Sequence, residues 1–129
     1  MNQKGFATLE VILMVVVIGI LATIAVPRFT DITTKANTAK IQADLATLNS
    51  AAQVYEMEKG ELPASPAVLA SSGYIVAEPV APDSGKFYLT VTGSATTTPD
   101  VSGKVYAIDK TTTKQATFDG HTIAEIGKK

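Results

Sequence analysis

The sequence lacks cysteine and tryptophan, and it contains a single histidine in 129 residues. Without cysteine the chain can form no disulfide, no thiolate metal site and no cysteine nucleophile. Its four Tyr and four Phe residues are few, so a soluble core must rest mainly on aliphatic side chains. The formal net charge of −1 gives no sign of a surface for nucleic acid or for an anionic membrane.

The sequence also offers little for catalysis or metal binding. The only histidine, His121, has no clustered acids around it and is expected at the surface or at a strand end. Four aspartates fall in predicted turns and strand ends without the ligand spacing of a calcium loop: Asp83, Asp100, Asp109 and Asp119. The Ser and Thr residues have no activating base or nucleophile motif. We therefore expect no catalytic residue, no metal site and no cofactor, and we predict that the protein is not an enzyme.

What the chain does contain is a long apolar segment near its start. From Phe6 to Val26 it has about the twenty residues that a membrane-spanning helix requires. Glu10 is the only charged residue in this segment. A carboxylate costs about 2.5–3.5 kcal/mol at the centre of a spanning helix and less near its end. Glu10 is therefore a candidate functional residue that needs a positively charged partner.

The string KGFATLE, residues 4–10, resembles the cleavage site of the prepilin family, which comprises the type IV pilins and the related pseudopilins. Gly5, Phe6 and Glu10 match the family motif in identity and spacing. The intervening residues 7–9 are Ala-Thr-Leu, whereas the family usually has Thr-Leu-Ile there. A secretory signal peptide is not indicated, because its cleavage site would follow the apolar region rather than precede it.

The resemblance implies that a prepilin peptidase removes a leader, residues 1–5, by cleaving between Gly5 and Phe6, and that the new Phe6 amine is methylated. Glu10 would then pair with the amino terminus of a neighbouring subunit inside a filament. Cleavage creates an ammonium group about one helical turn from Glu10. Between chains in an apolar bundle, such a pair sets axial register more than it adds stability. The alternative is that Glu10 lies at the membrane interface and is simply solvated.

Pro27 closes the predicted transmembrane and filament-core helix, residues 6–27. Proline removes a backbone donor and loosens a helix. By resemblance to the type IV pilins, Pro27 marks a section that can stretch in the filament. The alternative is that Pro27 and Arg28 only mark the exit from the membrane.

The predicted soluble pilin domain, residues 28–129, begins with an amphipathic helix over residues 28–59, which contain no Gly or Pro. Gly60 and Pro63 are expected to end it. One apolar stripe follows helical periodicity along it: Ile41, Leu45, Leu48, Ala52 and Tyr55. The polar residues Thr33, Thr34, Asn37 and Thr38 are expected to be covered by water or by neighbouring subunits. A helix from residue 6 to 59 would be about 80 Å long, so its protruding half requires lipid or other copies.

The remainder predicts a small antiparallel sheet. Residues 60–76 are read as a loop with one short helix between Ser65 and Gly73. Residues 86–92, 104–109 and 116–118 are read as strands, with an exposed hairpin connection over residues 93–103. The expected fold class is α+β: a long N-terminal helix packed against a small antiparallel sheet, as in type IV pilins.

The leading hypothesis is a major structural subunit of a type IV pilus or pilus-like filament. The resemblance implies as partners other copies of the chain, the prepilin peptidase and methyltransferase, a membrane platform and an assembly ATPase, with no direct binding of nucleic acid. The protein would be a single-pass inner-membrane protein before assembly and part of a surface or extracellular filament afterwards.

Two alternatives remain open. The first is a major pseudopilin of a type II secretion system or of a competence system for DNA uptake; the lack of the disulfide common in proteobacterial pilins fits pseudopilins and Gram-positive pilins. The second is a minor pilin or a membrane-anchored binding protein.

Overall fold

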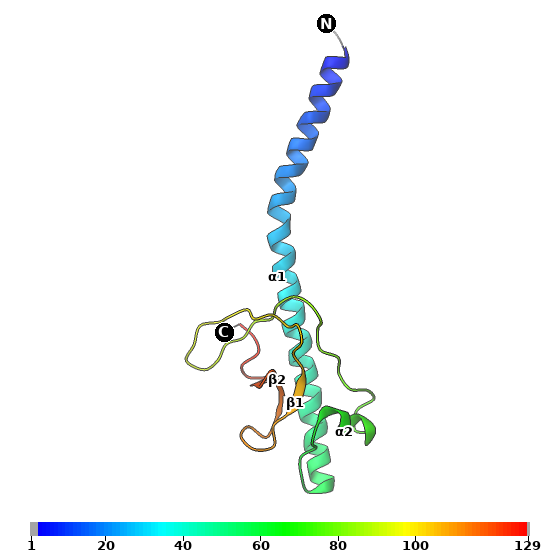
Figure 1. Cartoon of the computed structure of the whole chain (residues 1–129), viewed down its shortest axis with the longest axis vertical. Helices are drawn as coiled ribbons and strands as arrows, with labels where there is room; N and C mark the ends of the chain where they lie inside the picture. The colour runs from blue at the N-terminus through cyan, green and yellow to red at the C-terminus, as the bar shows by residue number, and fades with distance from the viewer. Residues whose placement is uncertain (1–2, 129) are drawn as a thin grey trace. The chain divides into compact units, whose positions relative to one another are not determined.

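The computed structural model describes residues 3–128, apart from the side chains of residues 26–28. The chain divides into two compact units, Met1–Ile32 and Thr33–Lys129. The elements, labelled in Figure 1 except for the last strand, are α1 (Gln3–Lys59), α2 (Pro66–Ser71), β1 (Tyr106–Ile108), β2 (Ala116–Phe118) and β3 (His121–Thr122). The fold class is α+β, as predicted.

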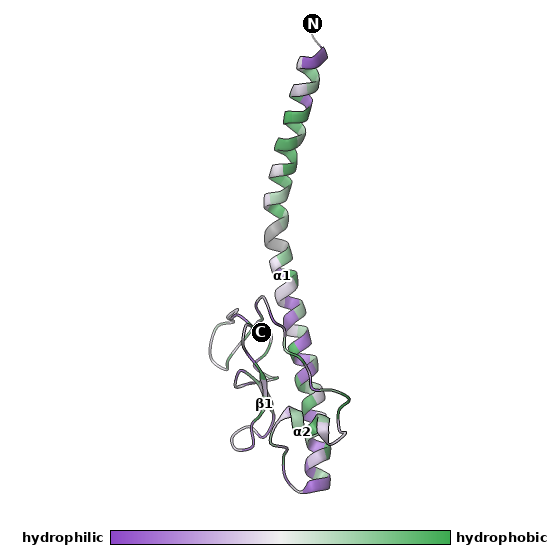
Figure 2. Cartoon of the chain, turned by 45° about the vertical axis from the view of Figure 1, so that its right-hand side comes forward, coloured by the Kyte–Doolittle hydropathy of each residue, from purple (hydrophilic) through white to green (hydrophobic). Residues whose placement is uncertain are grey.

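The first unit is the apolar half of α1. All side chains from residue 3 to residue 24 are exposed, and Figure 2 shows this part of the helix as mostly hydrophobic. The backbone at Pro27 belongs to α1. The surroundings of the Pro27 side chain lie outside the described residues, so the predicted stretchable section remains a prediction.

In the second unit, α1 buries the predicted apolar stripe. Ile41, Leu45 and Leu48 are fully buried, and Ala52 is 2% exposed. They pack in one cluster with two aromatic rings of the C-terminal half, Phe87 and Phe118, whose centroids lie 5.3 Å apart in an edge-to-face arrangement. The periodicity of the sequence therefore identified the buried face of the helix correctly.

The predicted end of the long helix and the short helix after it are confirmed. Gly60 has a φ of +82°, a conformation that favours glycine, and its N–H donates to the Glu56 carbonyl. Ser65 takes the N-cap position of α2 in an extended conformation, with Pro66 as the first helical residue.

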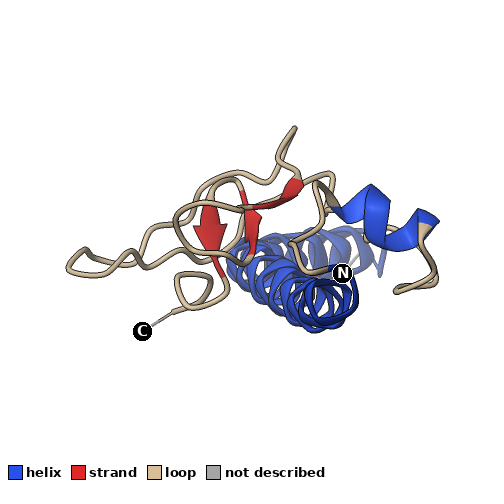
Figure 3. Ribbon diagram, turned by 90° about the horizontal axis from the view of Figure 1, so that it is seen from below, coloured by secondary structure: helices blue, strands red, loops and turns tan. Residues whose placement is uncertain are grey.

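The sheet is antiparallel with the order β1-β2-β3. Its three strands lie on one side of α1 (Figure 3). Tyr106 of β1 is opposite Phe118 of β2, which in turn is opposite His121 of β3. Asp119 and Gly120, both with positive φ, form the two-residue connection between β2 and β3. Strand β3 was not predicted.

The predicted strand at 86–92 is wrong as a continuous strand. Only two of its residues pair, in isolated bridges: Lys86 with Asp100, and Leu89 with both Thr97 and Ile126. Thr90, which period-two alternation assigns to the exposed face, is 8% exposed because its hydroxyl donates to the Gly127 carbonyl. Bonds to residues 125–127 thus replace part of the expected ladder: the Thr90 N–H donates to the Glu125 carbonyl, the Tyr88 carbonyl accepts the Gly127 N–H, and the Thr90 hydroxyl adds its own bond.

The other predicted elements agree better with the observed ones. The predicted strand at 104–109 is shortened to β1, whereas β2 has the predicted bounds. The connection over residues 93–103 is largely exposed, as expected, but it contains Val101, which is fully buried.

Polar side chains of α1 hold the backbone of the C-terminal half at several points, and we call Asn37, Thr38, Gln42 and Asn49 the tether residues. Asn37 Nδ2 donates to the carbonyls of Ser84 and Lys86, at 3.0 and 3.1 Å. Thr38 Oγ1 accepts the N–H of Tyr88 at 2.9 Å. Gln42 Nε2 donates to the Ile126 carbonyl, and Asn49 Oδ1 accepts the N–H of Ala116 at 2.7 Å.

The expectation that the polar section at 33–38 depends on water or neighbouring subunits is wrong for Thr34, Asn37 and Thr38, whereas Thr33 is exposed. Thr34 and Thr38 are 5% and 6% exposed within the chain itself. The section packs because its side chains supply donors and acceptors to loop backbone that has few strand partners.

Removing one tether should destabilise the soluble half. Asn49→Ala leaves the N–H of the fully buried Ala116 without its acceptor, which costs about 1–3 kcal/mol. We expect this loss in denaturant unfolding of the full chain in detergent, followed by the near-ultraviolet signal of the tyrosines. Gln53→Ala removes an amide from an exposed position of the same helix and should change stability by less than about 0.5 kcal/mol. Equal effects of the two variants would contradict the role of Asn49.

Asp109 organises the turn between β1 and β2. Its carboxylate accepts the backbone N–H groups of Thr113, Thr111 and Thr112, at 2.8, 2.9 and 3.1 Å. These three bonds lower the pKa of Asp109 well below its ordinary value. The turn-forming role expected for this aspartate is thus visible in its contacts.

This lowered pKa predicts a pH dependence of stability. Because the folded-state pKa is depressed, the stabilisation is complete above the unfolded-state pKa of about 3.9 and is lost as the pH falls toward the folded-state value. Asp109→Asn should be less stable than wild type at pH 7, and the difference should shrink below about pH 4. Unfolding at pH 7, 5 and 3 measures it. Asp83→Asn, at an exposed position, is the charge-matched control, and a constant difference for Asp109→Asn at all three pH values would contradict the assignment.

Candidate functional site

Gly5, Phe6 and Glu10 lie in consecutive turns at the start of α1. A Cβ on Gly5 would have no atom within 4 Å. The Phe6 side chain is 57% exposed, and Glu10 is exposed as well. Phe6 and Glu10 are four residues apart, which places them on one face of the helix. Within residues 3–128 no salt bridge is formed by Glu10.

This arrangement leaves both groups accessible from outside the chain. Hydrolysis of the Gly5–Phe6 bond would produce a Gly5 carboxylate and a Phe6 ammonium group. That ammonium group would lie on the same helical face as the Glu10 carboxylate, in reach of a second helix. Pro27, also on α1, is 17 residues beyond Glu10 and is not brought into this site.

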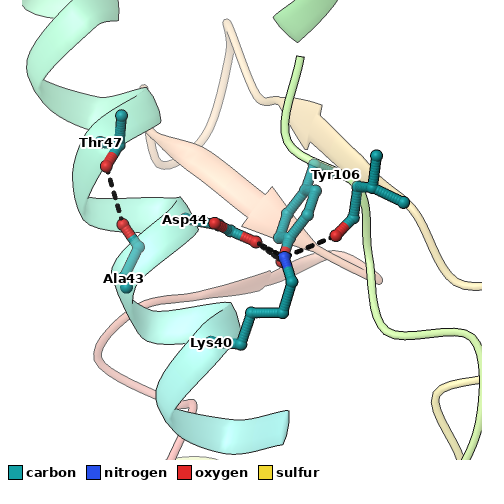
Figure 4. A network of polar contacts seen from close by, with 6 residues as sticks. Lys40, Ala43, Asp44, Thr47 and Tyr106 are labelled. Atoms are coloured by element: carbon teal, nitrogen blue, oxygen red, sulfur yellow. Dashed lines mark hydrogen bonds and ion pairs between the residues drawn. The ribbon is translucent and has the colours of Figure 1, made fainter. Parts of the chain in front are cut away.

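A second polar cluster lies in the soluble half (Figure 4). Asp44 Oδ2 accepts from the Tyr106 hydroxyl at 2.6 Å and from Lys40 Nζ at 2.5 Å, and Lys40 Nζ also donates to the Val80 carbonyl. Burial and the neighbouring Asp44 carboxylate raise the pKa of the Tyr106 phenol. The cluster joins α1, β1 and the loop at Val80, so its role is structural. Sequence reasoning missed it, although the i,i+4 spacing of Lys40 and Asp44 was a visible signal.

An apolar groove of about 520 Å³ runs along α1 in the same unit. Ala46, Ser50 and Val54 line one side, and Tyr74 with Ile75 lines the other. No charged side chain lines this groove. It therefore has the character of a packing surface rather than of a catalytic pocket.

The residues considered for metal binding have local roles. His121 Nδ1 lies 3.5 Å from Glu125 Oε2. Asp100 accepts the backbone N–H of Ser102, and Asp119 pairs with Lys104. Across residues 3–128, no three His, Cys, Asp or Glu side chains gather in a way that could hold a metal ion.

In the described part of the chain, α1 is the one helix that is long and apolar enough to cross a membrane. None of the 18 residues in its most apolar window is buried. The helix that could span a membrane is thus the helix that carries Gly5, Phe6 and Glu10.

Comparison with known proteins identifies several relatives. The chain is 33% identical over 128 residues to the type IV narrow pilus major component PilA5 of Thermus thermophilus, covering 99% of this chain and 92% of that protein. It is 29% identical over 87 residues to the type II secretion system core protein G of Klebsiella michiganensis, covering 67% and 59% of the two chains. A fimbrial protein of Pseudomonas aeruginosa is 35% identical over 63 residues, 49% of this chain and 41% of that one.

No family model and no solved structure matches the chain. The relatives are pilus and secretion-system subunits, and none of the three is named as an enzyme. Since the similarity to a pilus component extends over nearly the whole of both chains, this protein belongs to the type IV pilin and pseudopilin family.

Proposed function

We propose that this chain is a major structural subunit of a type IV pilus or of a closely related filament. The observation that carries the proposal is the alignment with a narrow-pilus major component along 99% of the chain. The exposed apolar half of α1 supports it, because this surface needs lipid before assembly and other copies of the helix afterwards.

The proposed mechanism is assembly from the membrane. The apolar half of α1 holds the subunit in the inner membrane, and a prepilin peptidase cleaves between Gly5 and Phe6 and methylates the new amine. A membrane platform and an assembly ATPase then move the subunit into a stack of N-terminal helices that reaches the cell surface. Glu10 meets the Phe6 ammonium group of another copy there, which fixes the axial position of each subunit.

A second candidate function is that of a major pseudopilin that drives protein secretion. The similarity to core protein G over 87 residues favours it, and so does the absence of cysteine. Long fibres in the sheared surface fraction would support the pilus, whereas secretion defects without such fibres would support the pseudopilin.

The first prediction concerns the native N-terminus. Protein from the membrane and from sheared filaments should begin at Phe6 and carry a methyl group on its amine. Intact-mass and N-terminal peptide mass spectrometry measure this directly. A mature chain that still begins at Met1 would contradict the proposed processing, because Glu10 would then have no terminal ammonium group to pair with.

The second prediction concerns assembly. Glu10→Gln should be processed normally but should form filaments with a yield at least about tenfold lower, since removing one partner of a buried pair costs about 3–5 kcal/mol. Filament yield is measured in the sheared fraction by immunoblot, relative to cleaved subunit in the membrane. Glu56→Gln makes the same change at an exposed position of the soluble half and should assemble like wild type. Normal yield from Glu10→Gln would refute the pairing.

A further inference from the structure

Two features weaken the helical turn that contains the Gly5–Phe6 bond. The first is Gly5 itself, because glycine is the poorest helix former after proline. No neighbouring atom lies within 4 Å of where a Cβ would be, so packing does not explain the glycine. The second is Thr8, whose Oγ1 donates to the carbonyl of Lys4 at 2.8 Å. The Gly5–Phe6 bond lies between Lys4 and Thr8, the two residues that this hydrogen bond connects.

The Thr8 hydroxyl shares its acceptor with the helix. In an α-helix the Lys4 carbonyl accepts the N–H of Thr8, four residues on. A threonine hydroxyl that donates to the same carbonyl competes with this backbone bond, and such back-bonding bends helices and slightly destabilises them. The turn from Lys4 to Thr8 is therefore easier to open than a turn of purely aliphatic residues.

Ease of opening matters because a peptidase acts on the open form. When opening and closing are fast relative to cleavage, the rate follows the population of the open form. Helix ends open most readily, so small changes in the first turns of α1 alter this population directly.

From these contacts we infer that Thr8 is a positioning residue for leader removal: its hydroxyl loosens the turn around the Gly5–Phe6 bond and so presents that bond for hydrolysis. The inference rests on the proposed processing. Water adds to the Gly5 carbonyl, the bond to the Phe6 nitrogen breaks, and the products are the Gly5 carboxylate and the Phe6 ammonium group. Thr8 acts before this step, by changing the backbone conformation, and does not touch the reacting atoms.

The chain supplies a matched control. Thr23 Oγ1 donates to the Ile20 carbonyl at 2.7 Å, also on the exposed surface of α1. Thr23 is exposed like Thr8 and also back-bonds to its own helix, although three residues back rather than four. It is fifteen residues beyond Thr8 and far along the helix from the cleavage site.

The experiment compares full-length wild type, Thr8→Val, Thr8→Ser and Thr23→Val as substrates of a prepilin peptidase in detergent. Valine keeps the branched shape of threonine and lacks the hydroxyl. We expect Thr8→Val to lower the initial rate of leader removal about twofold, because such back-bonding destabilises a helix only slightly. Thr8→Ser should restore the rate, and Thr23→Val should match wild type.

A second readout needs no peptidase. Amide hydrogen exchange over residues 6–10 of the uncleaved chain should slow in Thr8→Val and stay unchanged in Thr23→Val. A Thr8→Val chain that is cleaved as fast as wild type, or slowed cleavage without slowed exchange, would overturn the inference while the proposed function stands. Wild-type chain that the peptidase leaves intact would overturn the proposed processing, and this inference with it.

Discussion

The soluble half depends on one face of α1 between Thr34 and Tyr55. Aliphatic side chains of this face form one side of the hydrophobic core, and the tether residues beside them form hydrogen bonds with the loop backbone. The three strands of the sheet have two or three residues each, so strand pairing satisfies only a small part of the C-terminal backbone. A buried backbone group without a hydrogen-bond partner costs free energy. Side chains of α1 therefore supply partners that neighbouring strands would supply in a larger sheet.

The first half of the same helix has an exposed, mostly apolar surface. From residue 3 to residue 24 its side chains are all exposed, most of them large and apolar, so an isolated copy of the chain cannot satisfy them in water. One continuous helix thus has two different surfaces. A face of its second half packs within the chain, and the apolar surface of its first half requires lipid or other copies. This division of one helix between folding and assembly is the physical basis of a filament subunit.

The parts of the fold that follow from periodicity could be predicted from the sequence. The spacing of Ile41, Leu45 and Leu48 identified the buried face, and Gly60 and Pro66 located the end of α1 and the start of α2. The assigned strand at 86–92 was wrong as a continuous strand because its backbone divides between two partners, residues 97–100 and residues 125–127, and the alternating pattern does not reveal this division. Strand β3 was missed although Asp119-Gly120 is a strong hairpin signal. The tether residues could not have been identified, since their partners are backbone atoms at 47 to 84 positions' distance.

The candidate site shows a deeper limit of reasoning from one chain. Gly5, Phe6 and Glu10 were identified from their identity and spacing, and the structure places them on adjacent turns, yet it cannot contain the interaction that gives Glu10 its proposed role. The proposed positive partner would exist only after the Gly5–Phe6 bond is broken, and it would belong to another molecule. In lipid, an unpaired carboxylate near a helix end is tolerated at a modest cost. In a helical bundle the same carboxylate is stabilised at the one axial position that brings an ammonium group to it. In the proposed mechanism, cleavage would therefore change the helix from one that is best accommodated by lipid into one that is best accommodated by its own copies.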